Sequence, residues 1–245
     1  MAATEDAPPG VDLSQVVKIP TPLPWSDEFK INVYLIEANP LTLIDCGIRG
    51  EKPIETIERA FAERGRRIED IEQIVITHAH FDHYGSGAEL VRRSGARVFA
   101  HPIERVHMEH FPSGSDGYRD SAEHYFRLWG VDEALIEGFF RREQLMPMLR
   151  EDMGVDVNVE DGDRVKIEGF NLEAIHVPGH CQGHLCYLNR ARGILFSGDH
   201  LLPNISPVPL LALGTDPSAE KPKSFIQFLA SLEKIERFPA RIALP

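Results

Sequence analysis

Short apolar runs alternate with amphipathic segments along the first half of the chain. Four apolar runs that are rich in β-branched residues predict strands at 31–38, 41–47, 71–77 and 96–102, the first two forming a hairpin. Apolar residues at helical spacing predict helices at 53–65 and 85–95. This alternation of strands and helices predicts a layered α/β architecture.

The second half of the chain departs from that alternation. Residues 103–154 are polar with a helical pattern and predict a helical insertion, after which segments 165–179 and 185–199 carry strong strand signals. An amphipathic helix is predicted at 218–238 and a last strand at 241–245. We expect residues 1–12 to be a disordered N-terminus and residues 13–245 to form one domain, which includes the insertion.

Composition narrows the possible functions. The chain has 245 residues, 42% of them hydrophobic, and a formal net charge of −12. This acidity argues against nucleic acid as a partner, because phosphate binding needs a basic surface. The N-terminus has no secretory pattern, and no window approaches 18 consecutive apolar residues, so we expect a cytoplasmic protein with no membrane span. Three cysteines in a chain of this length do not indicate a disulfide framework.

Residues that could bind a metal are concentrated in the sequence THAHFDH, residues 77–83, where a predicted strand ends. Imidazole nitrogen and carboxylate oxygen are the ligands that zinc and similar divalent metals prefer. A tight loop could direct His78 and His80 at one ion and Asp82 and His83 at a second ion. Ligands at other strand ends would then be needed to complete two coordination shells.

Three other predicted strand ends offer such ligands, one before residues 77–83 in the sequence and two after them. The turn in HVPGHCQGH exposes His180, the sequence LFSGDH places Asp199 after a strand, and LIDCG offers Asp45. His184 is undecided between supporting a ligand and packing, and His200 is a neighbour of Asp199. The remaining histidines are expected to be solvated or structural: His101, His107, His110, His124 and His176.

These motifs, taken together, resemble those of the metallo-β-lactamase superfamily. THAHFDH resembles its HxHxDH signature, and LIDCG, PGHCQGH and SGDH resemble its remaining motifs in the expected order, over residues 16–245. The resemblance implies a four-layer αββα sandwich with metals at one edge of the sheets. GDHLLPNISP further resembles a subgroup that includes glyoxalase II-like thioesterases and lactonases, in which the helical insertion would cover the substrate.

The resemblance also implies a set of metal ligands. The first metal would be bound by His78, His80 and His180, the second by Asp82 and His83, and Asp199 would bridge the two. We expect Zn²⁺ at both sites, with iron or manganese as alternatives. Members of the family normally supply one more histidine from a PGH motif after a late strand, and RIALP ends at Pro245 just before that position. The second site is therefore expected to be weak, and the C-terminal region is expected to be missing.

The activity implied by the resemblance is hydrolysis of a small acyl thioester, lactone or related ester. The metals would lower the pKa of a shared water, the resulting hydroxide would attack the carbonyl, and Asp82 would hold the nucleophile. Two alternatives remain open at this point. One is a mononuclear-iron persulfide dioxygenase, and the other is a truncated metal-binding protein with little catalysis.

Overall fold

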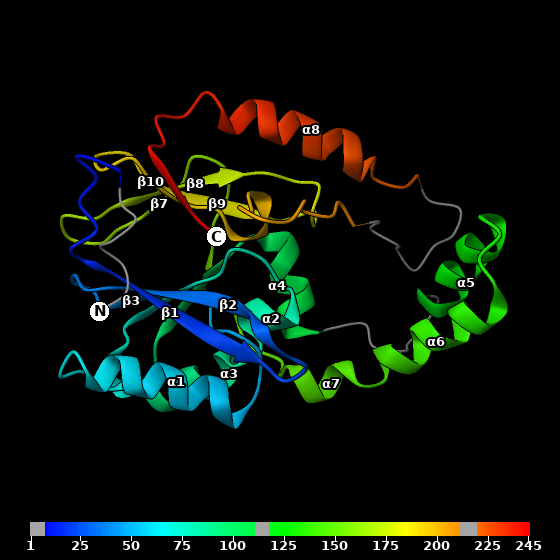
Figure 1. Ribbon diagram of the computed structural model, residues 1–245, viewed down its shortest axis with the longest axis horizontal. Helices are drawn as coiled ribbons and strands as arrows, with labels where there is room; N and C mark the ends of the chain where they lie inside the picture. The colour runs from blue at the N-terminus through cyan, green and yellow to red at the C-terminus, as the bar shows by residue number, and fades with distance from the viewer. Residues whose placement is uncertain (1–7, 111–117, 211–219) are drawn as a thin grey trace.

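The structure is a computed structural model that describes residues 8–110, 118–210 and 220–245. Two β-sheets lie face to face, and helices cover both outer faces (Figure 1). The predicted αββα sandwich is therefore confirmed.

The first sheet contains six strands, in the spatial order β1-β2-β3-β4-β5-β6. Their bounds are β1 Val16–Leu23, β2 Ser26–Ile36, β3 Thr42–Ile44, β4 Gln73–Val75, β5 Arg97–Ala100 and β6 Val157–Asn158. The strands from β3 to β6 are parallel, whereas β1, β2 and β3 pair antiparallel. The carboxyl ends of the parallel strands consequently meet at one edge, where sites are usually found in α/β sheets.

The second sheet has the order β11-β10-β9-β8-β7, with only β10 and β11 parallel. Its strands are β7 Arg164–Val165, β8 Leu172–His176, β9 Leu185–Asn189, β10 Ile194–Phe196 and β11 Ile242–Leu244. The helices are α1 Glu51–Ala62, α2 Phe81–Tyr84, α3 Gly87–Ser94, α4 Pro102–Glu109, α5 Tyr118–Leu128, α6 Glu133–Glu143, α7 Met146–Leu149 and α8 Ser224–Ile235. Two short 3₁₀ turns, η1 and η2, span Ile68–Asp70 and Gly198–His200.

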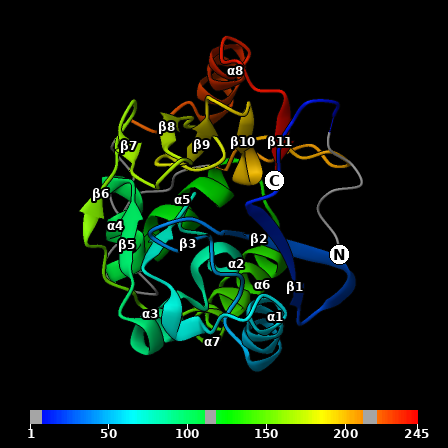
Figure 2. The same cartoon turned by 90° about the vertical axis from the view of Figure 1, so that its left-hand side faces the viewer.

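Three apolar layers hold the sandwich together. Large side chains such as Tyr34, Tyr187 and Phe196 fill the space between the two sheets. Helices α1 and α3 lie under the first sheet and α8 lies over the second (Figure 2). Their buried apolar side chains pack against the strands of these sheets. Because each sheet is covered on both faces, most strand side chains are apolar and buried, and the polar residues of a site are expected in the loops at the strand ends.

Helices α5 and α6 project from the sandwich as an arm (Figure 1). They pack on each other through a small apolar cluster that includes Ala122, Ile136 and Phe140. The arm returns to the sandwich through α7, which contacts α2. At that junction the backbone N–H of Arg49 donates to the carbonyl of Leu149 over 3.0 Å.

The structure differs from the sequence-based expectation at both ends of the chain. Strand β1 was not predicted, because Pro20 and Pro22 interrupt its pattern. The prolines are tolerated because β1 is an edge strand. Of the segment expected to be disordered, residues 1–7 lie outside the described residues, and Arg241 donates to the carbonyls of Pro9 and Gly10. The last helix is shorter than the predicted 218–238, of which 218 and 219 are also outside the described residues.

Candidate metal centre

Three histidine rings converge where the two sheets meet. His78 and His80 lie in the loop that follows β4, and His180 lies in the turn between β8 and β9. The Nδ1 atom of His80 is 2.9 Å from Nε2 of His78 and 2.9 Å from Nε2 of His180. His180 is 100 positions from His80 in the sequence, and the fold brings their ring nitrogens within contact distance.

Asp199 completes a group of four donors. It lies on the η2 turn after β10, and its Oδ2 atom is 3.4 Å from Nε2 of His180. One ligand atom from each of His78, His80, His180 and Asp199 can be chosen so that all four lie within 4.8 Å of one another. Bonds of about 2.0–2.1 Å to a tetrahedral zinc ion would separate neighbouring ligand atoms by about 3.3 Å, so the spacing of this group fits such an ion.

The protonation of these histidines also suits metal binding. Burial lowers the pKa of His78 well below its usual value, and burial together with the charge of His180 lowers the pKa of His80 to about 3. Burial also lowers the pKa of His180. Since a metal requires the neutral imidazole as its ligand, the fold holds these three rings ready to bind without first releasing a proton.

A second pair of donors lies beside the first group. The Nε2 atom of His83 is buried and lies 3.4 Å from Oδ1 of Asp199, with no well-aligned hydrogen-bond partner among the described residues. The two oxygens of Asp199 therefore face different histidines, Oδ2 towards His180 and Oδ1 towards His83. Such an arrangement allows one carboxylate to contact two ions.

Asp199 and His83 shift each other's pKa values. Burial opposes the charged forms, but His83 and His180 lower the pKa of Asp199, and Asp199 with Asp45 raises the pKa of His83. Asp82, on the short helix α2, is half-buried and interacts electrostatically with His83 and Asp199. Burial raises its pKa, which makes its carboxylate a better proton acceptor than an exposed one.

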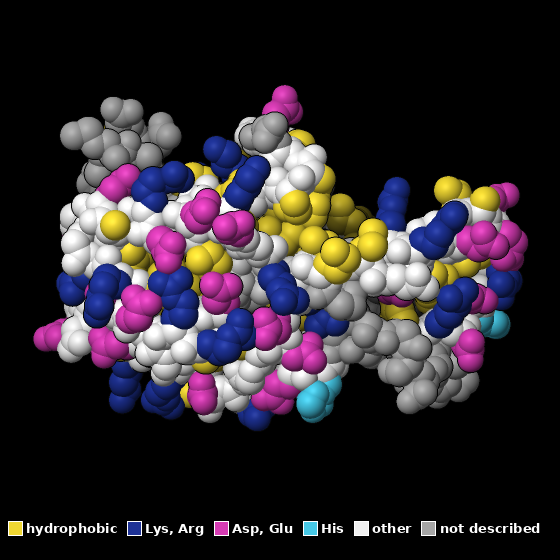
Figure 3. All heavy atoms as spheres, turned by 90° about the horizontal axis from the view of Figure 1, so that it is seen from below, with side chains coloured by type: hydrophobic (Ala, Val, Ile, Leu, Met, Phe, Trp, Pro, Cys, Tyr) yellow, Lys and Arg dark blue, Asp and Glu magenta, His cyan; other side chains and the backbone are white. Residues whose placement is uncertain are grey.

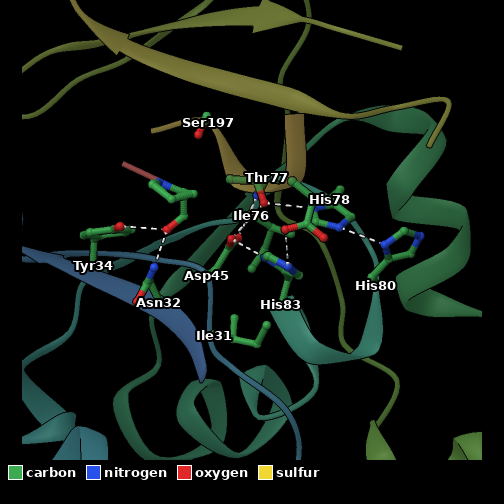
Figure 4. A network of polar contacts seen from close by, with 12 residues as sticks. Ile31, Asn32, Tyr34, Asp45, Ile76, Thr77, His78, His80, His83 and Ser197 are labelled. Atoms are coloured by element: carbon green, nitrogen blue, oxygen red, sulfur yellow. Dashed lines mark hydrogen bonds and ion pairs between the residues drawn. The ribbon is translucent and has the colours of Figure 1, made fainter. Parts of the chain in front are cut away.

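Asp45 orients His83 directly and His78 through Thr77 (Figure 4). It follows β3 in a left-handed backbone conformation with φ of 59°, which is uncommon for a residue other than glycine. Its carboxylate accepts hydrogen bonds from the backbone N–H of Thr77, the hydroxyl of Thr77 and Nδ1 of His83, each over 2.8 Å. A strained backbone at such a position is typical of functional sites.

These bonds determine which nitrogen of each ring is free. The hydroxyl of Thr77 gives its only proton to Asp45, so Nδ1 of His78, 3.0 Å away, must donate to the hydroxyl oxygen. In the same way, Nδ1 of His180 donates to the carbonyl of Val208 over 2.8 Å. The Nε2 atoms of His78 and His180 are left with their lone pairs directed at the centre. The Nε2 atom of His83 faces Asp199, and because the pKa of His83 is raised, this nitrogen has to release a proton before it can bind a metal.

The decisive comparison is with a model of a protein family. The family model of the metallo-beta-lactamase superfamily matches residues 26–245. The chain belongs to the metallo-beta-lactamase superfamily. The fold and the family that the sequence motifs resemble are thus both confirmed.

Two relatives and one solved structure illustrate what the chain is similar to. The probable metallo-hydrolase YqjP of Bacillus subtilis is 27% identical over 94% of this chain and 69% of its own length. The hydroxyacylglutathione hydrolase GloC of Haemophilus influenzae is 25% identical over 65% of this chain and 60% of its own length. A metallo-beta-lactamase family protein from Thermus thermophilus superposes with a TM-score of 0.75 at 25% identity, covering 95% of this chain and 73% of that one. The chain therefore spans about two thirds of YqjP and less than two thirds of GloC.

The other histidines have different environments. His184, which the sequence left undecided, is fully buried and stacks on His78 with ring centroids 4.7 Å apart. His101 and His176 stack on each other, whereas His107, His110 and His124 are exposed.

No helix in the described ranges is long and apolar enough to span a membrane.

Thr77 and Val208 contact the ligand rings although the sequence motifs predicted no role for either residue. The only sequence signal for Thr77 was its position directly before His78, where a hydroxyl can accept from the ring. Val208 acts through its backbone carbonyl, which any residue could supply, so the side chain carries no signal.

Replacing Asp45 with asparagine is expected to weaken metal binding about 10–100-fold, the usual cost of losing a group that orients a ligand. In Asp45→Asn, an amide N–H₂ can replace the oxygen that accepts from His83, so this ring loses the bond that fixes its tautomer. Metal affinity measured by competition with a chelator checks this expectation. Asp163→Asn is a suitable control, since that carboxylate accepts from the backbone N–H of Glu160 in a surface turn. Equal affinities in the two variants would contradict the orienting role.

Proposed function

We propose that this chain is a metal-dependent hydrolase that cleaves small acyl thioesters, lactones or related esters with two Zn²⁺ ions. The observation that carries the proposal is the geometry of Asp199, whose two oxygens face His180 on one side and His83 on the other. The first ion would be held by His78, His80 and His180, and the second by Asp82 and His83, with Asp199 between them. When bound, the metals would supply Lewis acidity and a water of lowered pKa.

The residues of the chain would divide the remaining work. Asp82 would accept a hydrogen bond from the attacking water and receive its proton on a carboxylate oxygen. Asp45 and Thr77 would keep His78 and His83 in the tautomers that face the metals. Burial of the donors would exclude bulk water and strengthen the electrostatic interactions within the site.

The surroundings of the centre favour a substrate with an apolar group. Trp25, at the tip of the β1–β2 hairpin, is 57% exposed and makes an edge contact with Phe81, the neighbour of His80 and Asp82. Val208, whose carbonyl binds His180, is 58% exposed. Seen from below, hydrophobic side chains also gather between the sandwich and the arm (Figure 3). The name of GloC, a hydroxyacylglutathione hydrolase, supports an acyl thioester as the substrate class.

A panel of acyl thioesters, lactones and carboxylic esters, offered to protein loaded with Zn²⁺, Mn²⁺ or Fe²⁺, tests the proposal. We expect hydrolysis of at least one class, lost on treatment with a chelator and restored by metal. If the protein binds two metals but hydrolyses no member of the panel, the proposed substrate class is wrong.

A mononuclear-iron persulfide dioxygenase is the second candidate. Three histidines and one aspartate form a complete mononuclear donor set without Asp82 and His83, and histidine with carboxylate is a donor set that iron also accepts. One equivalent of iron in protein purified without added metal, together with oxygen uptake on addition of a persulfide, would favour this candidate over the hydrolase.

Removal of the arm is expected to change substrate preference and leave metal content unchanged. Helices α5 and α6 bury their apolar residues mainly against each other, so replacing residues 118–143 with a short Gly/Ser linker leaves the three apolar layers of the sandwich intact. If the arm contacts the acyl group, kcat/KM for large apolar substrates should fall about tenfold or more relative to acetyl substrates. Steady-state kinetics with an acyl-length series and elemental analysis of the same samples measure both effects. A loss of metal and of folded protein would show instead that the arm is part of the structural core.

A further inference from the structure

Glu104 is a buried carboxylate that the proposed reaction does not use. It lies in the first turn of α4, directly after the end of β5, and is only 3% exposed. A buried carboxylate is costly unless several donors surround it, so its hydrogen bonds indicate what it does.

The two oxygens of Glu104 bind two different ligand loops. Oε2 accepts from the backbone N–H of Ala79 over 2.7 Å, and Oε1 accepts from the backbone N–H of Gly183 over 2.8 Å. Ala79 lies between His78 and His80, and Gly183 lies three residues after His180. One side chain thus joins the loop of the first sheet to the loop of the second.

The second loop is shaped to admit this carboxylate. A Cβ atom on Gly183 would lie 2.7 Å from Oε1 of Glu104 and 2.8 Å from Nδ1 of His101, closer than real Cβ contacts. The thiol of Cys181, next to His180, also hydrogen-bonds to Glu104. The short N–H distances agree with charge-assisted hydrogen bonds, which are about twice as strong as neutral ones.

We propose that Glu104 is a positioning residue that sets the spacing between the His78–His80 loop and the His180 loop, and thereby the affinity and geometry of the first metal site. A carboxylate suits this role because both of its oxygens are acceptors. A glutamine offers one acceptor, and its amide N–H₂ would face the N–H of the other loop. The inference rests on the ligand assignment of the proposed function.

Glu104→Gln tests the inference, with Glu109→Gln as the matched control. Glu109 is on the same helix and also accepts from a backbone N–H, that of Val155, but it contacts neither ligand loop. We expect Glu104→Gln to lower Zn²⁺ affinity of the folded protein about 10–100-fold in competition with a chelator. The visible absorption spectrum of the Co²⁺-loaded protein should change as well, because it reports the ligand geometry. Glu109→Gln should match the wild-type protein in both measurements.

A second variant, Gly183→Ala, tests the same contact from the other side and displaces the carboxylate without removing it. Weakened Zn²⁺ binding and an altered Co²⁺ spectrum in a folded protein support the inference for either variant. Wild-type Zn²⁺ affinity and a wild-type Co²⁺ spectrum in either folded variant would overturn the inference. A variant whose metal-free form loses thermal stability while its metal affinity is unchanged would also overturn it. Full metal retention by His80→Ala would instead show that the ligand assignment itself is wrong.

Discussion

His80→Ala is expected to remove nearly all tightly bound metal and with it the hydrolytic activity. The Nδ1 atom of His80 lies 2.9 Å from Nε2 of both His78 and His180, so it is the central donor of the group. Three histidines leave no spare nitrogen ligand, and removal of one leaves an incomplete shell. We expect the metal-to-protein ratio to fall towards zero after dialysis against a weak chelator, and kcat/KM to fall by at least about a thousandfold.

Elemental analysis of the dialysed protein measures this loss, and circular dichroism establishes that the variant is folded. His124→Ala is the control, because His124 is exposed on α5 and its ring contact is with Tyr125, which is not part of the metal centre. A His80→Ala protein with full metal content and activity would require a different set of ligands.

Asp82→Asn is expected to reduce turnover strongly while the first metal remains bound. The substitution keeps the size of the side chain but removes the negative charge and the ability to accept a proton. Loss of a general base costs about 10²–10⁴-fold in rate, and we expect kcat to fall within this range. The four-donor group around His80 does not include Asp82, so the affinity for one metal should change little.

Single-turnover kinetics at several pH values and a metal titration of the same sample separate the two effects. If Asp82 is the general base, the wild-type rate should decline on the acid side as this carboxylate becomes protonated. The acid limb should be absent or displaced in Asp82→Asn. Turnover equal to that of the wild-type protein would remove Asp82 from the mechanism.

The sequence was informative wherever a functional residue follows a strand. His78, Asp199 and Asp45 each come within three residues of the end of an apolar run, and strand ends meet at one edge of a sheet, so their proximity could be expected. The motif pattern also predicted the αββα sandwich. Strand β1 was missed because Pro20 and Pro22 resemble loop residues until the strand is known to lie at an edge.

Contacts between distant segments could not be predicted in this way. Glu104 is 25 residues from Ala79 and 79 residues from Gly183, and its hydrogen bonds exist only after both sheets have formed. The left-handed conformation of Asp45 likewise depends on Thr77 and His83, which hold its carboxylate from a neighbouring strand end and helix. The local pattern of apolar and polar residues contains no information on contacts between segments that are far apart in the sequence.

The division of the first donor set between the sheets has a thermodynamic consequence. His78 and His80 belong to the first sheet, and His180 and Asp199 belong to the second, so an ion bound to all four links two halves that separate on unfolding. A ligand that binds only the folded state adds about 2.7 kcal/mol to the unfolding free energy at a hundred times its dissociation constant. The lifetime of the folded domain is therefore coupled to the concentration of free metal around it, and metal starvation would act on the amount of protein as well as on its activity.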